Sequence, residues 1–285
     1  MVDIINPMTI SEKLAYATVR IDTEAGAGTG FLIYKKINEK TIIPLLVTNK
    51  HVIYADKEQT CLTQKGQLIF HKANSEGEPI NDVVPVFYEK DFGKNFVLHP
   101  DSSIDLCALN IAPIIDYYAK RGINIFIRYI QLDLIPTEAQ LAELDYMEDI
   151  FMIGYPCALR DDIHNYPIIR KGITATHPCI DFNGKKEFLA DIANMPGSSG
   201  SPVFLFKNGY VNKQGDFVIG QSILFFMGIS YSAPIRPVKG TIDIVDVPTA
   251  IKVINNLYEM TNLAYVIKST ELFALTDLFG GKNDL

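Results

Sequence analysis

Most of the chain consists of short runs rich in Val, Ile, Phe and Tyr, separated by Gly, Pro, Asn and Asp. Runs of this length and composition are typical of β-strands in barrels or sandwiches rather than of alternating strand–helix units. We therefore predict strands at residues 17–22, 29–36, 42–48, 82–88, 104–111, 149–156, 168–176, 188–193, 201–206 and 217–232.

Two segments have the spacing of helices instead. In PTEAQLAELDYMED, Thr137 and Gln140 form the pattern of a capping box, which predicts a helix start. A second helix is predicted from Val247, because Pro248 suits a first helical turn and apolar residues follow at helical spacing. The members of this apolar stripe are Val247, Ile251, Ile254 and Tyr258.

The first helical segment lies near the midpoint and reads as a connector between two β-rich halves. We place the halves at residues 1–135 and 136–285, with the second helical segment closing the fold at its C-terminal end. A chain of 285 residues is long enough for such a division, since each half can bury a core of its own.

Composition narrows the class of protein. Hydrophobic residues make up 48% and charged residues 21%, and the longest apolar run, at residues 223–229, is too short to span a bilayer. The N-terminal stretch MVDIINPMTISEK has no basic start followed by an apolar core, so no secretion signal is indicated and we expect a cytoplasmic protein. The net charge of -7 and the lack of a Lys/Arg cluster argue against nucleic-acid or membrane binding.

Four cysteines are scattered along the chain, and none forms a CxxC pair. In an intracellular chain we expect reduced thiols rather than disulfides. A zinc site can be drawn from two cysteines and two histidines, but their spacing matches no structural zinc pattern, so we expect no metal and no cofactor. The four residues of that rejected site are Cys157, His164, His177 and Cys179.

The stretch MPGSSGSPVF, residues 195–204, has three serines within four positions, bracketed by glycine and proline. A Gly-Ser-rich surface turn is one interpretation. The other is a nucleophilic serine, which needs a base to take its proton and a carboxylate to orient that base. The two glycines permit a tight turn and the two prolines stiffen it, as a preorganised oxyanion hole requires.

One histidine and one aspartate fit the other two roles. His51 ends the apolar run LLVTNKHVI, where a buried strand meets a loop, and Asp105 directly precedes an alternating strand; Asp101, in a polar turn, is the fallback. With Ser199 these residues run in the order His, Asp, Ser, which is the order of chymotrypsin-like enzymes. The GxSxG elbow of α/β-hydrolases is absent.

The segment LADIANMPGSSGSPVF resembles the nucleophile segment of trypsin-like peptidases, most closely that of the bacterial HtrA/Deg branch. Four further segments resemble that family in the same order: VTNKHVI its histidine segment, IDLCALNI its aspartate segment, and DIFMIGYP and IIRKGITAT two of its strands. In the nucleophile segment the residues that match in register are Asp191, Pro196, Gly197, Ser199, Gly200 and Pro202.

The resemblance implies an all-β, chymotrypsin-like fold of two six-stranded antiparallel barrels with a C-terminal helix. It also implies a serine endopeptidase that cleaves polypeptides through an acyl-enzyme on Ser199, with His51 as general base and Asp105 as the orienting acid. The oxyanion hole is expected at Gly197, Ser198 and Ser199. The substrate side chain is expected at Ala193, six positions before the nucleophile, and at Gly228 and Ile229.

The chain departs from the family pattern at two positions beside the nucleophile. Ser198 stands where the branch often has Asn and trypsin has Asp, and Ser201 replaces a glycine. Too little chain follows Ile235 for a PDZ domain. Two other functions stay open, a catalytically silent fold used as a protein-binding module and an esterase. An intracellular peptidase also needs restraint, which is compatible with a regulatory protein partner.

Overall fold

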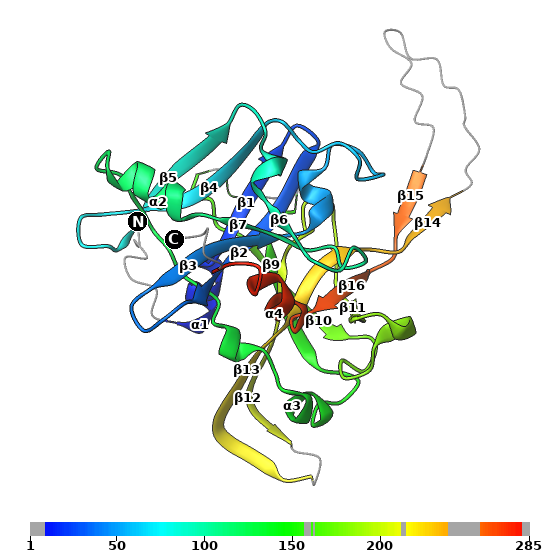
Figure 1. Ribbon diagram of the computed structural model, residues 1–285. Coiled ribbons are helices and arrows are strands. Elements are labelled where there is room, and N and C mark those ends of the chain that lie inside the picture. Colours follow the sequence, from blue (N-terminus) through cyan, green and yellow to red (C-terminus); the bar gives the residue numbers. More distant parts are fainter. Residues whose placement is uncertain (1–8, 157–160, 162, 212–214, 239–256, 281–285) are drawn as a thin grey trace, which may run out of the picture.

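The computed structural model describes residues 9–156, 161, 163–211, 215–238 and 257–280. Two antiparallel sheets make up most of it, as the sequence predicts (Figure 1). All ten predicted strands are present. The fold class is therefore confirmed as chymotrypsin-like.

The N-terminal sheet has eight strands, two more than the six expected, because two strands of only two residues each, β6 and β8, add to it. Its order is β5-β4-β1-β2-β3-β7-β6, and β8 pairs with β4. The bounds are β1 (Thr18–Thr23), β2 (Gly26–Lys36), β3 (Ile42–Thr48), β4 (Gly66–Ala73), β5 (Pro79–Tyr88), β6 (Val97–Leu98), β7 (Cys107–Asn110) and β8 (Asn124–Ile125).

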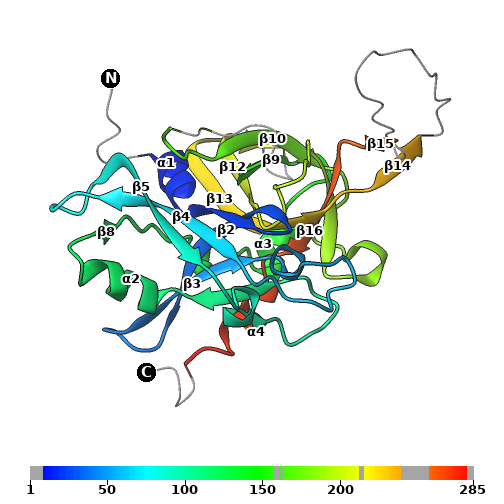
Figure 2. The same cartoon turned by 90° about the horizontal axis from the view of Figure 1, so that it is seen from above.

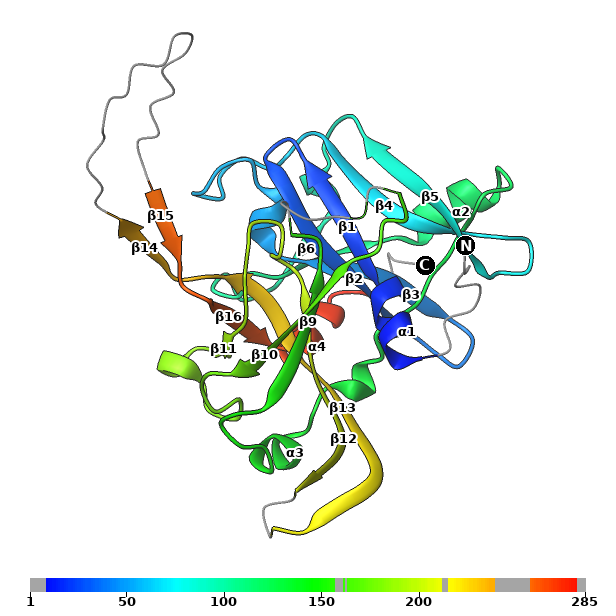
Figure 3. The same cartoon turned by 180° about the vertical axis from the view of Figure 1, so that it is seen from behind.

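The C-terminal sheet is a closed barrel of six strands in the order β10-β11-β16-β13-β12-β9. Strands β12 and β13 continue beyond the barrel as a long hairpin, and β14 pairs with β15 in a separate ribbon (Figure 3). The bounds are β9 (Asp149–Gly154), β10 (Ile168–Thr174), β11 (Glu187–Asp191), β12 (Pro202–Val211), β13 (Phe217–Ser232), β14 (Ile235–Val238), β15 (Leu257–Met260) and β16 (Leu263–Lys268).

The helices are short. The capping box at Thr137 is confirmed, since its hydroxyl accepts from the Gln140 amide and the Gln140 side chain accepts from the Thr137 amide. The helices are α1 (Ile10–Tyr16), α2 (Ala112–Ala119), α3 (Glu138–Ala142) and α4 (Glu271–Thr276), with 3-10 turns at η1 (Lys50–Ile53), η2 (Gly93–Asn95), η3 (Leu132–Leu134) and η4 (Phe182–Gly184).

Most of the apolar stripe of the second predicted helix, from Val247 to Ile254, lies outside the described residues. Its last member, Tyr258, lies in strand β15 rather than in a helix. The C-terminal helix is α4, further along. Figure 2 shows α4 in red on the same side of the molecule as β3. The predicted boundary between the two halves of the chain, at residue 135, stays a prediction.

One apolar core joins the two sheets. Phe31 of β2 meets Phe226 of β13 edge to face, with ring centroids 5.3 Å apart, and Phe226 stacks on Phe204 of β12 at 5.2 Å. Leu272 and Leu275 of α4 are fully buried in the same cluster. The two sheets therefore pack against each other through the side chains of one shared core, and α4 contributes to that core.

Two neighbours in α4 allow a matched test of this packing. Leu272 is fully buried whereas Phe273 is 48% exposed. We predict that Leu272→Ala lowers the free energy of unfolding by about 2–5 kcal/mol, because it leaves a cavity in the shared core. Phe273→Ala should cost less than about 1 kcal/mol. Urea denaturation measures both, and equal losses in the two variants would contradict the role given to α4.

Candidate active site

The antiparallel pairing of β3 with β7 brings His51 and Asp105 to one edge of the N-terminal sheet. Thr48, the last residue of β3, lies opposite Cys107, the first of β7, so the residues just after β3 and just before β7 come together. The His51 Nδ1 atom lies 2.5 Å from the Asp105 Oδ2 atom, and the His51 amide donates to the Asp105 Oδ1 atom at 3.1 Å. One carboxylate thus fixes both the ring and the backbone of His51.

The loop that carries Asp105 is itself held in place. The Asn49 side chain donates to the Asp105 carbonyl at 2.8 Å, and the buried Lys50 ammonium donates to the Asp101 carbonyl at 3.0 Å. Burial lowers the pKa of Lys50, and the nearby Asp105 charge opposes that shift. Asp101, the fallback candidate, is exposed and accepts from Ser103 instead. Asp105 is the aspartate in contact with His51.

The nucleophile turn depends on its two glycines. Gly197 and Gly200 have φ values of 90° and 87°, in the left-handed region that favours glycine. A Cβ on Gly200 would lie only 1.9 Å from the carbonyl oxygen of Thr29. Gly200 therefore lets the turn approach the backbone of β2 closely, which no side chain would permit.

Thr29 of β2, which the sequence analysis did not identify, joins the turn to both sheets. Its amide donates to the Ser199 carbonyl and its hydroxyl donates to the Gly197 carbonyl, both at 2.8 Å. That hydroxyl also accepts from the Tyr155 amide at 2.9 Å, and the Thr48 hydroxyl donates to the Thr29 carbonyl at 2.7 Å. Thr29 is fully buried, so these bonds are shielded from water.

The result is that Ser199 and His51 line the same small cavity, of about 160 Å³. Thr23, Ala27 and Val52 complete part of its wall. The histidine and the aspartate come from the N-terminal sheet and the serine from the second barrel. The structure thus brings together the three residues that the sequence singled out.

The backbone amides of Gly197, Ser198 and Ser199 differ in whether they have a hydrogen-bond acceptor. Ser198 donates its amide to the Met195 carbonyl at 2.9 Å, so this group does not point into an oxyanion hole as the sequence analysis had it. Among the described residues, no acceptor is recorded for the amides of Gly197 and Ser199. These two amides, on either side of Ser198, are therefore candidate donors of an oxyanion hole. Ser198 is fully buried, and its hydroxyl faces the interior.

The expected substrate residues Gly228 and Ile229 lie in β13. They pair with β12 on one side and with β16 on the other. The next residue along, Ser230, is hydrogen-bonded to the nucleophile turn, because Gly200 donates to its carbonyl at 2.9 Å. A role of Gly228 and Ile229 in substrate binding stays a prediction.

Two other residues near the predicted pocket are placed by hydrogen bonds. Ala193 is half-buried, and its carbonyl accepts from Arg170 at 2.5 Å. Asp191 is exposed and accepts from the Asn262 side chain at 2.7 Å, on the outer side of the barrel. The Asp191 carboxylate therefore lies at the exposed surface of the protein.

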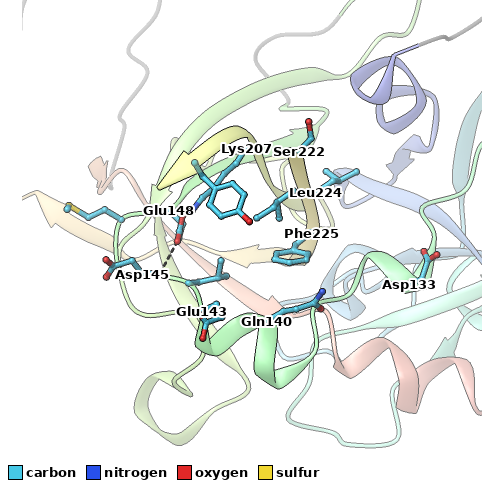
Figure 4. Close-up of a pocket in the computed structure, with 13 residues that line it drawn as sticks. Asp133, Gln140, Glu143, Asp145, Glu148, Lys207, Ser222, Leu224 and Phe225 are labelled. Carbon is cyan, nitrogen blue, oxygen red and sulfur yellow. Dashed lines mark hydrogen bonds and ion pairs between the residues drawn. The ribbon is translucent and has the colours of Figure 1, made fainter. Parts of the chain in front are cut away.

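A separate cavity of about 770 Å³ lies between the β12–β13 hairpin and the residues around α3 (Figure 4). Its acidic residues include Asp133, Glu143 and Asp145, and the buried Glu148 forms an ion pair with Lys207. It shares no lining residue with the cavity of His51 and Ser199.

Within the described ranges, no group of three or more His, Cys, Asp or Glu side chains is placed to hold a metal ion. None of the helices in these ranges is long and apolar enough to cross a membrane.

Two antiparallel sheets with a histidine–aspartate pair on one and a serine turn on the other define a chymotrypsin-like serine hydrolase. The family model described as Trypsin-like peptidase domain matches residues 28–211, which include His51, Asp105 and Ser199, and the chain belongs to this family. It is a trypsin-like serine peptidase. A search of curated proteins finds no match.

Solved structures similar to this chain are peptidases of low sequence identity. An inactive form of Rv3671c from M. tuberculosis H37Rv has 12% identity and a TM-score of 0.44, covering 98% of this chain and 93% of that one. A Glu endopeptidase has 11% identity and a TM-score of 0.45, covering 93% and 90%. A human pathogenic astrovirus serine protease has 10% identity and a TM-score of 0.40, covering 89% and 90%. The family assignment rests on the family model.

The close approach at Gly200 gives a testable prediction. Gly200→Ala should destabilise the protein more than Gly77→Ala does. Both glycines have positive φ, 87° and 81°, but the space around Gly77 is open within 4 Å. Gly77→Ala therefore reports only the backbone strain of about 1–2 kcal/mol, whereas Gly200→Ala adds a clash with β2. Thermal unfolding compares the two, and a Gly200→Ala variant as stable as Gly77→Ala would refute the contact.

Proposed function

We propose that Ser199 is the nucleophile of an endopeptidase, with His51 as its general base and Asp105 as the group that orients His51. The observation that supports this most is the 2.5 Å contact from Asp105 to His51 Nδ1, which leaves Nε2 as the ring atom to serve Ser199 in the shared cavity. A histidine tied to a carboxylate in this way has its tautomer fixed, and its charged form is stabilised.

The reaction then proceeds in two halves. The Ser199 oxygen attacks the carbonyl carbon of the scissile peptide bond while His51 Nε2 takes the hydroxyl proton. The tetrahedral intermediate collapses as His51 gives that proton to the leaving amine, and an ester to Ser199 remains. Water then attacks the ester with His51 again as base, which releases the acid product and restores Ser199.

The negative oxygen of each tetrahedral intermediate accepts hydrogen bonds from the amides of Gly197 and Ser199. Both donors are fixed by the turn before the substrate arrives, so they need little reorganisation during the reaction. Losing one such donor typically costs about 3–4 kcal/mol of transition-state stabilisation. The geometry of the turn therefore contributes to the rate in addition to the contribution of His51 and Asp105.

The substrate is a polypeptide, and we propose that its P1 side chain is small or apolar rather than Lys or Arg. Ala193 offers no negative charge at the base of the pocket, and the nearest acidic residue on that strand, Asp191, is bonded to Asn262. We further propose a cytoplasmic enzyme under the control of a regulatory protein partner, because an active peptidase among cellular proteins has to be restrained.

A catalytically silent binding module is the alternative function. Such a module has no need for a fixed histidine–aspartate pair facing the same cavity as the serine. The contacts of His51 therefore favour the enzyme.

Labelling distinguishes these two functions. We predict that Ser199→Ala abolishes both peptide hydrolysis and labelling by a fluorophosphonate probe, because the nucleophilic oxygen is gone. Ser201→Ala is the matched control: the Ser201 hydroxyl is buried two positions away and has no recorded partner within the described residues. It should keep most of both signals. Unchanged labelling in Ser199→Ala would end this assignment.

The choice of aspartate has its own test. Asp105→Asn should lower kcat on the order of 10³ to 10⁴-fold, because an amide neither stabilises the charged imidazole nor fixes its tautomer. Asp101→Asn, four residues earlier and exposed, should change kcat less than about threefold. Steady-state kinetics on a chromogenic peptide measures both. A larger loss in Asp101→Asn than in Asp105→Asn would reverse the assignment.

A further inference from the structure

Arg170 of β10 is partly buried, and its guanidinium is hydrogen-bonded to the nucleophile turn. Its Nη1 atom donates to the Ala193 carbonyl at 2.5 Å and its Nη2 atom donates to the Ser198 hydroxyl at 2.9 Å. The Nε atom is buried without a recorded partner, and among the described residues no carboxylate forms an ion pair with this guanidinium. Arg170 therefore directs its recorded hydrogen bonds to the one segment that carries the oxyanion amides.

The two acceptors lie at opposite ends of that segment. Ala193 follows the end of β11, and Ser198 is the residue between the two amides of the oxyanion hole. The Ser198 hydroxyl also accepts from the Met195 amide at 3.3 Å, so the guanidinium completes a small network inside the turn. A planar group with several fixed donors can hold two such points at a set separation, which a lysine ammonium cannot do.

A guanidinium in this position does not favour the folding stability of the protein. Burying a charged group without a counter-charge is costly, and an apolar side chain of similar volume usually serves a barrel as well or better. Burial lowers the pKa of Arg170 to about 10, so the group remains charged at neutral pH and its desolvation is not relieved by losing a proton. A cost of this kind points to a positional role.

We propose that Arg170 is a positioning residue that holds residues 193–198 in the conformation in which the Gly197 amide faces the reacting carbonyl. The proposal rests on the proposed peptidase function. Arg170 touches neither the substrate nor the triad in this account. It acts on the turn through Ser198 and Ala193. The positive charge beside the turn therefore comes from a side chain of the same protein.

The effect should fall on the chemical step. Without the guanidinium, the triad contacts of His51 are intact but one oxyanion donor is no longer fixed. We expect Arg170→Met, which keeps volume and removes the charge, to lower kcat about 100-fold while KM changes less than threefold. Lys171→Met is the matched control, because Lys171 is the next residue of β10, is exposed, and contacts Asp149 and the Phe151 ring rather than the nucleophile turn. It should keep wild-type kinetics.

Chemical rescue separates a positional role from a merely structural one. In Arg170→Ala, added ethylguanidinium, which matches the atoms removed, should raise kcat at least tenfold, whereas ethylammonium should not, because only the planar fork reaches both acceptors. Thermal unfolding of each variant shows whether it is folded. A folded Arg170→Met with wild-type kcat would overturn the proposal, and so would a loss of kcat in Arg170→Ala that ethylguanidinium does not reverse.

The controls distinguish this proposal from the peptidase assignment. If wild-type protein neither hydrolyses peptides nor reacts with a fluorophosphonate, the proposed function fails and Arg170 has no reaction to support. If wild-type protein does both and Ser199→Ala does neither, the proposed function stands. A normal Arg170→Met then overturns the role of Arg170 alone.

Discussion

The nucleophile turn and strand β2 touch through backbone atoms, and the site depends on that contact. Thr29 and Ser199 are joined by a 2.8 Å hydrogen bond, and Gly200 lies so close to Thr29 that even a Cβ has no room. Because His51 stands on the N-terminal sheet and Ser199 on the barrel, the distance between them is set by how these two parts meet. The shared aromatic core around Phe226 supports the same junction from inside.

Polar groups are buried at this junction, where an apolar interface would be more stable. The Thr29 hydroxyl donates to the Gly197 carbonyl across the junction, and the Thr48 hydroxyl donates to the Thr29 carbonyl within the N-terminal sheet. Each such bond is directional, whereas apolar packing is not. Arg170 adds two further hydrogen bonds to the same turn, at Ala193 and Ser198. A misplaced oxyanion donor would lower the rate by about 10²–10³-fold. This loss of activity outweighs the loss of folding stability that comes with burying these polar groups.

The three candidate catalytic residues could be predicted from the sequence because each lies in a short local motif, and the order of these motifs along the chain is informative. Thr29 and Arg170 were not, since their roles arise from contacts with residues more than twenty positions away, and nothing in TGFLIYKK or IIRKGITAT marks them. Strand β16 was missed because the apolar stripe before it has helical spacing, and the short strands β6 and β8 are too brief to show a period. The register of β13 beside the nucleophile turn could not be predicted either, because it depends on strand pairing.

The account is tested most directly by the crystal structure of the protein treated with a peptidyl chloromethyl ketone ending in alanine. The account predicts that the inhibitor methylene is bonded to His51 Nε2 and its carbonyl carbon to Ser199 Oγ. The resulting oxygen should lie about 2.7–3.1 Å from the amides of Gly197 and Ser199. An adduct at another residue, or a carbonyl oxygen directed away from these two amides, would contradict it.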